Sequence, residues 1–324
     1  MSRDICIFQD FLTEDYRAQI QRTAREAGFV PHFFTESQFE EARACLQHCE
    51  VLYAQSPALL RTAPKTLKWY CASSAGVDVY CQNDGIFANP DCLLSNSNSY
   101  GVTIAEHVVM VTLMLLRRMP EYAAPLMQHQ WPAPMPIRSI RDSGITILGA
   151  GDIGGNVARR MRGMGAGKIT GISRSGRARE DVYDEMHPIS DLDALLPKAQ
   201  ILVMALPGTA ETAGILSRER IALLPRDAVV VNVGRGTAID QPALVEALNA
   251  GRIAGAALDV MMPEPLPADD PLWTAKNVVL TPHTSGNLTL GHTCQTNVDM
   301  FCEDLVNYAA GRKLVHLVDR ARGY

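Results

Sequence analysis

The chain has 324 residues, of which 47% are hydrophobic and 20% are charged, and its formal net charge is -5. A length beyond the usual ~100 to 200 residues of one domain indicates two domains, and the ordinary composition excludes disordered, collagen-like and fibrous classes. Because the basic residues are spread along an acidic chain, we expect no nucleic-acid partner.

The first eight residues are not expected to be a secretory signal. They carry charged Arg3 and Asp4 beside the apolar residues 5–8, and the chain then turns polar. We therefore expect a cytoplasmic protein. The longest apolar stretch, residues 108–116, is far shorter than the roughly 20 residues that cross a bilayer, so we expect no membrane segment.

The first hundred residues predict a small α/β domain. A helix is expected over residues 13–27, since Gly28 stops the helical pattern. Short β-rich runs are strand candidates, and their alternation with amphipathic stretches favours a parallel sheet. These runs are residues 5–8, 51–54 and 67–71.

A second unit follows a long helix. Residues 102–118 predict this helix, and the proline-rich stretch over residues 131–136 cannot continue it. Beyond it, the pattern becomes a strand over residues 145–148, a glycine-rich turn, a helix to about Met164 and a strand over residues 169–172. This order is that of a βαβ unit.

Later segments would fill a doubly wound sheet in this second unit. The strand candidates are residues 201–205, 228–232, 254–259 and 278–281, with a helix over residues 241–250. A last helix over residues 290–310 could return to pack on the first domain. The predicted fold class is α/β, with two Rossmann-like domains, parallel sheets and an active-site cleft between the domains.

A glycine fingerprint lies between the first predicted strand and helix of the second unit. Gly149 would allow the tight turn, Gly151 would let backbone amides approach a pyrophosphate, and Gly154 would let helix and strand pack closely. Asp152 and Ile153 complete the segment. This context predicts a dinucleotide site.

The end of the next strand bears on the choice of cofactor. An acidic residue there favours NAD, but the sequence reads Ser173-Arg174-Ser175. Hydroxyl groups and a guanidinium can donate hydrogen bonds to a 2′-phosphate, and an Arg can bind the phosphate with two parallel hydrogen bonds. NADP is therefore favoured, with NAD possible; the alternative is an ordinary solvated basic loop.

Three ionisable residues lie at or after predicted strand ends, where a parallel sheet builds its site: Arg235, Glu264 and His283. Reduction of a 2-oxo acid needs a cation to hold the carboxylate and polarise the ketone, and an acid to protonate the developing alkoxide. Arg235 and His283 would supply these functions. Glu264 would orient the imidazole of His283 and favour its protonated form.

Together the motifs resemble the D-isomer-specific 2-hydroxyacid dehydrogenase family, which includes the glyoxylate and hydroxypyruvate reductases. The resemblance covers most of the chain. Besides the fingerprint and the three ionisable residues, it includes Ser73-Ser74-Ala75-Gly76-Val77-Asp78, Ala105-Glu106-His107-Val108, Leu206-Pro207 with Thr212, Pro271-Leu272-Trp273, Asn277-Val278 and Thr281-Pro282-His283.

This resemblance implies hydride transfer between NAD(P)H and a small 2-oxo acid, giving the D-2-hydroxy acid, in a homodimer. Residues 1–100 and 288–324 would form the substrate-binding domain, and residues 101–287 the dinucleotide-binding domain. The substrate carboxylate would bind Arg235 and the turn of Ser74, Ala75, Gly76 and Val77, and Asp259 would lie near the nicotinamide carboxamide. Further cofactor-binding candidates are Leu206, Pro207, Thr212, Val233, Gly234, His283 and Ser285.

Other interpretations stay open. The chain could be a non-catalytic dinucleotide-sensing protein, like the transcriptional corepressors that share this fold, or a family member acting on phosphoglycerate or formate. His107 lies on a mostly apolar helix and is expected to make structural hydrogen bonds. The histidines lack metal-ligand spacing, so we expect no metal, and the eight cysteines are expected to be reduced core thiols.

Overall fold

A computed structural model describes residues 3–83 and 85–324 of the chain. The chain divides into two compact units. The first runs to Tyr100 and resumes at Asn287–Tyr324, and the second is Gly101–Gly286. The second unit is therefore inserted into the first along the sequence. Within the described residues, no helix is both long and apolar enough to cross a bilayer.

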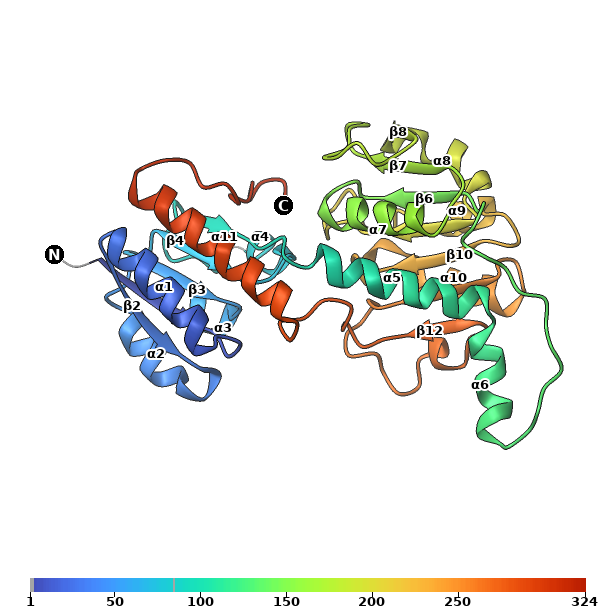
Figure 1. The fold of residues 1–324 in the computed structure, drawn as a ribbon, viewed down its shortest axis with the longest axis horizontal. Coiled ribbons are helices and arrows are strands. Elements are labelled where there is room, and N and C mark those ends of the chain that lie inside the picture. Colours follow the sequence, from blue (N-terminus) through green and yellow to red (C-terminus); the bar gives the residue numbers. More distant parts are fainter. Residues whose placement is uncertain (1–2, 84) are drawn as a thin grey trace. The chain divides into compact units, whose positions relative to one another are not determined.

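The first unit is built on a parallel sheet with the strand order β2-β1-β3-β4-β5 (Figure 1). Its strands are β1 (Arg3–Phe8), β2 (Phe29–Phe34), β3 (Val51–Ala54), β4 (Trp69–Ala72) and β5 (Leu93–Ser95). Its helices are α1 (Glu14–Glu26), α2 (Phe39–Leu46), α3 (Pro57–Leu60), α4 (Asp78–Cys81) and α11 (Gly291–Ala309).

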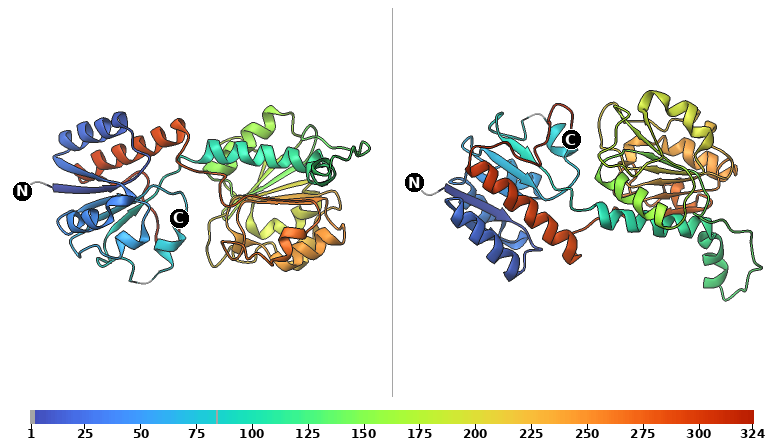
Figure 2. Two further views of the ribbon diagram at one scale, coloured as in Figure 1. Left: turned by 90° about the horizontal axis from the view of Figure 1, so that it is seen from below. Right: turned by 45° about the horizontal axis from the view of Figure 1, so that its top comes forward.

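Both faces of this sheet are buried, as expected of a parallel sheet. Ile5 and Ile7 pack in the core beneath α1 and α11, whereas Cys6 and Phe8 pack beneath α2 and α3. Figure 2 shows α1 and α11 together on one face, with α2 on the other. On the α11 face, Phe301 stacks on Tyr53 with ring centroids 4.2 Å apart.

The second unit is a larger parallel sheet with the order β12-β11-β10-β9-β6-β7-β8. Its strands are β6 (Ile145–Leu148), β7 (Ile169–Ser173), β8 (Glu185–Pro188), β9 (Ile201–Met204), β10 (Val229–Asn232), β11 (Gly255–Leu258) and β12 (Val278–Leu280). Its helices are α5 (Gly101–Leu116), α6 (Met119–Met127), α7 (Asp152–Gly163), α8 (Leu192–Leu195), α9 (Arg218–Leu223) and α10 (Gln241–Asn249).

The direction of winding reverses in this sheet between β6 and β9. The chain winds outward from β6 through β7 to β8, then returns to place β9 on the other side of β6. α5 contacts α7 and also β10, β11 and β12, so these two helices lie on one face (Figures 1 and 2). α9 and α10 pack in the core of the other face. Such a reversal places a ligand crevice at the carboxyl ends of the strands.

The predicted fold class, two α/β domains with parallel sheets, is confirmed. The long predicted helices agree with α1, α5, α10 and α11 to within about two residues. The predicted helix over residues 102–118 is shorter than expected, because Arg118 adopts a left-handed backbone conformation with φ of 59° before α6 begins. Three strands escaped the prediction: β2, β5 and β8.

Candidate active site

The three ionisable residues predicted from the sequence follow neighbouring strands of the second sheet. β11 lies between β10 and β12, and Asn232, Leu258 and Leu280 are partners in register at the last position of each strand. Neighbouring strands lie ~4.8 Å apart, so the segments that carry Arg235, Glu264 and His283 leave the sheet at one edge within about two strand spacings.

His283 and Glu264 contact each other directly. Nδ1 of His283 lies 2.8 Å from Oε2 of Glu264, and both side chains are partly exposed. Since a carboxylate can only accept, Nδ1 carries the proton of this bond, and Nε2 is the ring nitrogen left to meet a substrate. The pair can therefore hold and deliver a proton at Nε2.

The backbone of His283 is hydrogen-bonded to the residue that follows β11, the neighbouring strand. Its φ is 53°, a left-handed conformation that is uncommon for a residue with a side chain. Its N–H donates to the carbonyl oxygen of Asp259 at 2.9 Å and also lies 2.9 Å from that of Thr281. The imidazole therefore stands on a turn anchored to the end of β11.

The loop that carries Glu264 is held from several sides. The backbone N–H of Met261 donates to Oε1 of Glu264 at 3.0 Å. Gln241, the first residue of α10, exchanges two hydrogen bonds of 3.0 Å with the backbone of Met262. Nε1 of Trp273 donates to the carbonyl of Pro267 at 2.7 Å. No pattern in the sequence indicates that Gln241 holds this loop.

Asp259 organises the end of β11 and is 2% exposed. Its carboxylate accepts from the hydroxyl of Thr281 at 2.6 Å and from the backbone N–H groups of Thr284 at 2.9 Å and Ser285 at 3.0 Å. Burial acts to raise the pKa of Asp259, but hydrogen bonds from Ser285, Thr281 and Thr284 outweigh it and lower that pKa. A buried anion thus lies directly behind the turn that carries His283.

His107 contacts this network from α5. Its Nε2 lies 3.3 Å from Oγ1 of Thr281. The Thr281 hydroxyl gives its hydrogen to Asp259, so His107 acts as the donor to Thr281. Burial lowers the pKa of His107, and the charge of Asp259 opposes this only in part. The hydrogen bond agrees with the structural role expected for His107.

Arg235 sits in a tight turn after β10. Asn232 closes this turn: its Nδ2 donates to the carbonyl of Arg235 at 2.9 Å, and its Oδ1 accepts from the N–H of Gly234 at 3.1 Å. A Cβ on Gly234 would lie 2.6 Å from the carbonyl oxygen of Leu206, and one on Gly236 would overlap the backbone of Met261. The turn that carries the half-buried Arg235 is therefore wedged between its neighbours.

The glycine fingerprint has the geometry of a pyrophosphate cradle. Gly149 has φ of 101°, and a Cβ there would overlap the carbonyl of Ala205; a Cβ on Gly154 would overlap the carbonyl of Gly149. Gly151 caps α7 without a side chain, so the first amides of the helix, from Asp152, Ile153 and Gly154, face outward for an anion.

The carboxylate of Asp152 makes hydrogen bonds within the second unit. It lies against the N-terminus of α5, where the N–H of Gly101 hydrogen-bonds to it, and Asn156 Nδ2 donates to it at 3.1 Å. Burial raises the pKa of Asp152 in spite of this hydrogen bond and the charges of Arg179 and Arg159. Only the backbone N–H of Asp152 is thus suited to a cofactor phosphate.

The basic loop after β7 reaches back to the fingerprint. The hydroxyl of Ser173 accepts from the N–H of Arg177 at 3.0 Å and shapes the loop, while Arg174 and Ser175 are exposed. The N–H of Arg179 donates to the carbonyl of Ala150 at 3.4 Å. A run of arginines therefore flanks the glycine turn, and Arg179 extends the set predicted from the sequence.

The other cofactor candidates lie at the same edge. Leu206 and Pro207 follow β9, Val233 and Gly234 follow β10, and Ser285 is held by Asp259. The hydroxyl of Thr212 donates to the carbonyl of Pro207 at 2.6 Å and accepts from the N–H of Thr209 at 2.9 Å. Thr212 thereby closes the loop after β9.

The turn of Ser74, Ala75, Gly76 and Val77 belongs to the first unit and follows β4. Its carbonyl oxygens are engaged within that unit: Ala75 accepts from Asn96 Nδ2 at 2.7 Å, Gly76 from the Ser74 hydroxyl at 2.9 Å, and Ser74 from the N–H of Ser97 at 3.2 Å. With its carbonyls held in this way, the turn can present N–H groups to an anion.

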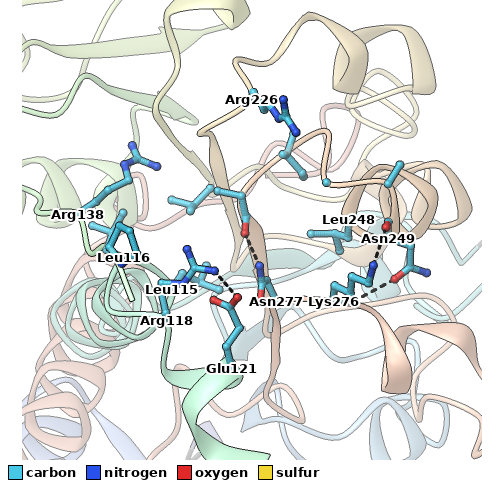
Figure 3. Close-up of a pocket in the computed structure, with 16 residues that line it drawn as sticks. Leu115, Leu116, Arg118, Glu121, Arg138, Arg226, Leu248, Asn249, Lys276 and Asn277 are labelled. Carbon is cyan, nitrogen blue, oxygen red and sulfur yellow. Dashed lines mark hydrogen bonds and ion pairs between the residues drawn. The ribbon is translucent and has the colours of Figure 1, made fainter. Parts of the chain in front are cut away.

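A polar cavity lies at the opposite, amino-terminal edge of the second sheet (Figure 3). It has a volume of about 470 Å³, and Val229, Ala254 and Asn277 mark the strand starts that line it. Three of its basic side chains have local partners: Arg118 pairs with Glu121, Arg138 with Asp227, and Lys276 Nζ donates to the Asn249 carbonyl at the end of α10. Its lining contains none of the predicted site residues.

Metal-ligating groups do not gather in the part of the chain that the structure describes: no cluster of three His, Cys, Asp or Glu side chains there could hold an ion. The cysteines are free thiols, most of them buried.

Comparisons with known proteins identify a matching family and similar chains. Residues 109–285 match the family described as "D-isomer specific 2-hydroxyacid dehydrogenase, NAD binding domain". A glyoxylate/hydroxypyruvate reductase A from Salmonella paratyphi B is 30% identical over 275 residues, covering 83% of this chain and 85% of that protein.

Two crystal structures are similar over nearly the whole chain. A D-isomer specific 2-hydroxyacid dehydrogenase family protein from Aeromonas salmonicida has 29% identity and a TM-score of 0.81, covering 99% of this chain and 100% of that one. An NADPH-dependent glyoxylate/hydroxypyruvate reductase from Sinorhizobium meliloti, in complex with NADP and sulfate, has 26% identity and a TM-score of 0.80, covering 100% of both chains.

Proposed function

Because this chain belongs to the D-isomer specific 2-hydroxyacid dehydrogenase family, we propose that it reduces a small 2-oxo acid, such as glyoxylate or hydroxypyruvate, to the D-2-hydroxy acid with NADPH. The observation that carries the proposal is the 2.8 Å hydrogen bond between His283 Nδ1 and Glu264, at the sheet edge that also bears the glycine turn. An oriented imidazole at that edge suits a proton donor for a substrate beside a nicotinamide ring.

Each residue has a separate role in the proposed reduction. NADPH, when bound, supplies the hydride that reaches C2 of the 2-oxo acid. Arg235 holds the substrate carboxylate and draws electron density toward the ketone oxygen, helped by the N–H groups of the turn from Ser74 to Val77. His283 delivers the proton from Nε2 to the same oxygen, and Glu264 keeps the ring oriented and stabilises its positive charge.

The cofactor is held by backbone and basic groups. The amides at the start of α7 suit the pyrophosphate, and the loop from Ser173 to Arg179 suits the 2′-phosphate that distinguishes NADP from NAD. The S. meliloti reductase, which was solved with NADP, supports this preference. We propose that Asp259 and Ser285 contact the nicotinamide end, since Ser285 follows the turn that carries His283 and donates its N–H to Asp259.

We also propose a cytoplasmic homodimer. Buried free thiols suit a reducing compartment. α6 and the segment after it carry large apolar side chains in water: Met127 is 83% exposed and Trp131 is 95% exposed. Exposed apolar side chains gathered on one projecting segment mark a protein interface, and a second copy of this chain is the partner that most soluble oligomers use.

The decisive experiment is a steady-state assay of NADPH and NADH oxidation with glyoxylate, hydroxypyruvate and bulkier 2-oxo acids. We expect turnover with the small acids, and we expect His283→Ala to lower kcat by about 10²- to 10⁴-fold while the Kd for NADPH stays nearly unchanged. The exposed His292 supplies a control, since His292→Ala should behave as wild type.

Two results would contradict the proposal. An equal loss of turnover and of NADPH binding in His283→Ala would show that the imidazole supports the cofactor site and not proton delivery. Tight NADPH binding without turnover of any acid would favour a dinucleotide sensor, which the intact pair of His283 and Glu264 otherwise disfavours.

A further inference from the structure

Three cysteines of the first unit converge beneath α2. Cys6 lies on β1, Cys45 lies near the end of α2, and Cys49 follows in the turn after this helix. The sulfur atoms of Cys45 and Cys49 are 3.7 Å apart, and the Cys6 thiol points to the carbonyl of Ala42 on α2 at 3.7 Å. Most of the other free thiols are buried elsewhere in the cores of the chain.

The members of this cluster differ in their access to solvent. Cys45 is partly exposed, whereas Cys6 is 0% and Cys49 is 1% exposed. A dissolved oxidant can therefore react with Cys45 first, and the buried thiol of Cys49 lies next to it. This is the arrangement of an attacked thiol with a resolving thiol next to it.

The surroundings favour a thiolate at Cys45. The neighbouring thiols of Cys49 and Cys6 lower the pKa of Cys45, against the effect of burial, and the nearby His32 and His48 add to the lowering. The neighbouring Cys45 and burial raise the pKa values of Cys6 and Cys49, so Cys45 is the thiol of the cluster that ionises first. A thiolate is the nucleophilic form of cysteine.

The backbone allows a bond between the two sulfurs. To form a disulfide, the sulfur atoms must close from 3.7 Å to about 2.05 Å. α2 ends at Leu46, and the N–H of Cys49 donates to the Leu46 carbonyl at 3.1 Å in the following turn. Cys49 is thus outside the rigid helix and can approach Cys45 by a small adjustment of this turn.

We propose that Cys45 and Cys49 are a peroxide-sensitive thiol pair that closes to an intramolecular disulfide. The Cys45 thiolate attacks one oxygen of hydrogen peroxide, the O–O bond breaks, and after proton uptake the products are the Cys45 sulfenic acid and water. The Cys49 thiol then attacks the Cys45 sulfur, the S–O bond breaks, and a second water leaves. Overall, two thiols and one peroxide give one disulfide and two waters.

The test uses the full-length protein treated with hydrogen peroxide, followed by blocking of the remaining thiols and peptide mass spectrometry. We expect a Cys45–Cys49 linkage that dithiothreitol reverses. In Cys49→Ser the reaction should stop at a Cys45 sulfenic acid, which dimedone traps, and Cys45→Ser should form no linkage. Cys81 is the internal control, since it is also partly exposed but burial raises its pKa.

Before oxidation, Cys45 should react with iodoacetamide at least about tenfold faster than Cys81, because its thiolate fraction is larger. Cys49→Ala, which buries no hydroxyl, repeats the test if the serine variant is unstable, and a thermal unfolding curve checks that each variant is folded. Equal reactivity of Cys45 and Cys81 would overturn the proposal. Linkage of Cys45 to Cys6, or irreversible oxidation of Cys45 in the wild type without linkage to Cys49, would also overturn it.

Discussion

The carboxylate of Asp259 holds the backbone around His283 in place, a role that its position in the sequence does not suggest. It is buried, it accepts hydrogen bonds from three neighbouring residues, and its own backbone carbonyl receives the N–H of His283. A buried anion is tolerated only when it is satisfied in this way. The residue therefore sets the conformation of residues 281–285, from which the imidazole projects.

His107 should make the stability of the protein sensitive to acid. Burial lowers its pKa, so the unfolded chain binds the proton more readily than the folded one. The contribution of neutral His107 is then complete above the unfolded pKa of about 6.5 and is lost progressively as the pH falls below it. We expect the free energy of unfolding, measured in urea from about pH 8 to about pH 5, to decline less steeply in His107→Gln than in wild type.

The exposed His292 provides the comparison for that series, because His292→Gln should leave the slope of the wild type unchanged. If the free energy of unfolding falls equally steeply with pH in His107→Gln and in wild type, then protons that bind at other groups cause the loss of stability in acid.

Arg174 should determine the choice between the two nicotinamide cofactors. A charge-assisted hydrogen bond to a 2′-phosphate contributes about 1.5 to 3 kcal/mol, and an aspartate would instead repel the phosphate. We expect Arg174→Asp to raise KM for NADPH by about tenfold to a hundredfold with little effect on NADH. Arg22→Asp changes the charge equally on α1 of the first unit and serves as the control. An unaltered ratio of kcat/KM for the two cofactors would place the 2′-phosphate elsewhere.

The sequence indicated the proposed catalytic residues, but it did not indicate the residues that hold them in position. Arg235, Glu264 and His283 stand out because charged side chains after apolar strands are conspicuous. The groups that hold them were not visible in the same way: Asn232 closes the Arg235 turn, Gln241 binds the Glu264 loop, and both depend on contacts between segments far apart in the chain. Spacing along a sequence carries no record of such contacts.

Among the elements, α7 joins the cofactor cradle to the sheet, and its glycines are not equivalent. A Cβ on Gly154 would overlap the carbonyl of Gly149, whereas one on Gly163 would meet open space. Gly154→Ala must push the helix away from the strand end, at a cost of about 1 to 3 kcal/mol. Gly163→Ala only restricts the unfolded chain and should stabilise the protein by about 0.5 to 1 kcal/mol.

Thermal unfolding and NADPH titration of these two variants of one helix check the cradle directly. We expect Gly154→Ala to lose both stability and NADPH binding, and Gly163→Ala to keep the binding of wild type. Normal NADPH affinity in Gly154→Ala would show that the close approach of helix and strand is dispensable.

The strands that escaped the sequence prediction share a place in the fold. β2 and β5 are the two edges of the first sheet, and β8 is an edge of the second. Strands buried on both faces read as runs of Val, Ile and Leu, such as Val229–Asn232, whereas an edge strand faces water and tolerates proline. β2 contains Pro31 and β8 ends at Pro188. The interior strands were predictable because burial dictates their composition.

For the whole molecule, the projecting segment around α6 should govern assembly. The double variant Met127→Asp/Trp131→Asp places two charges where we propose that the second copy packs, and charge at the centre of an apolar interface is strongly unfavourable. Size-exclusion chromatography with light scattering should give a dimer for wild type and a monomer for the variant. Val315→Asp, at another exposed apolar position, should remain dimeric. A wild-type monomer, or a dimeric double variant, would reject this interface.

The discontinuity of the first unit affects the order in which a nascent chain can fold. Gly101–Gly286 is contiguous and carries its own sheet and core, so it can fold as soon as it has left the ribosome. The first hundred residues emerge earlier, yet one face of their sheet is covered by Phe301 and Leu305 from α11. The part of that face beside α1 stays uncovered until almost two hundred further residues have been synthesised, and it is the surface to which we expect a chaperone to bind.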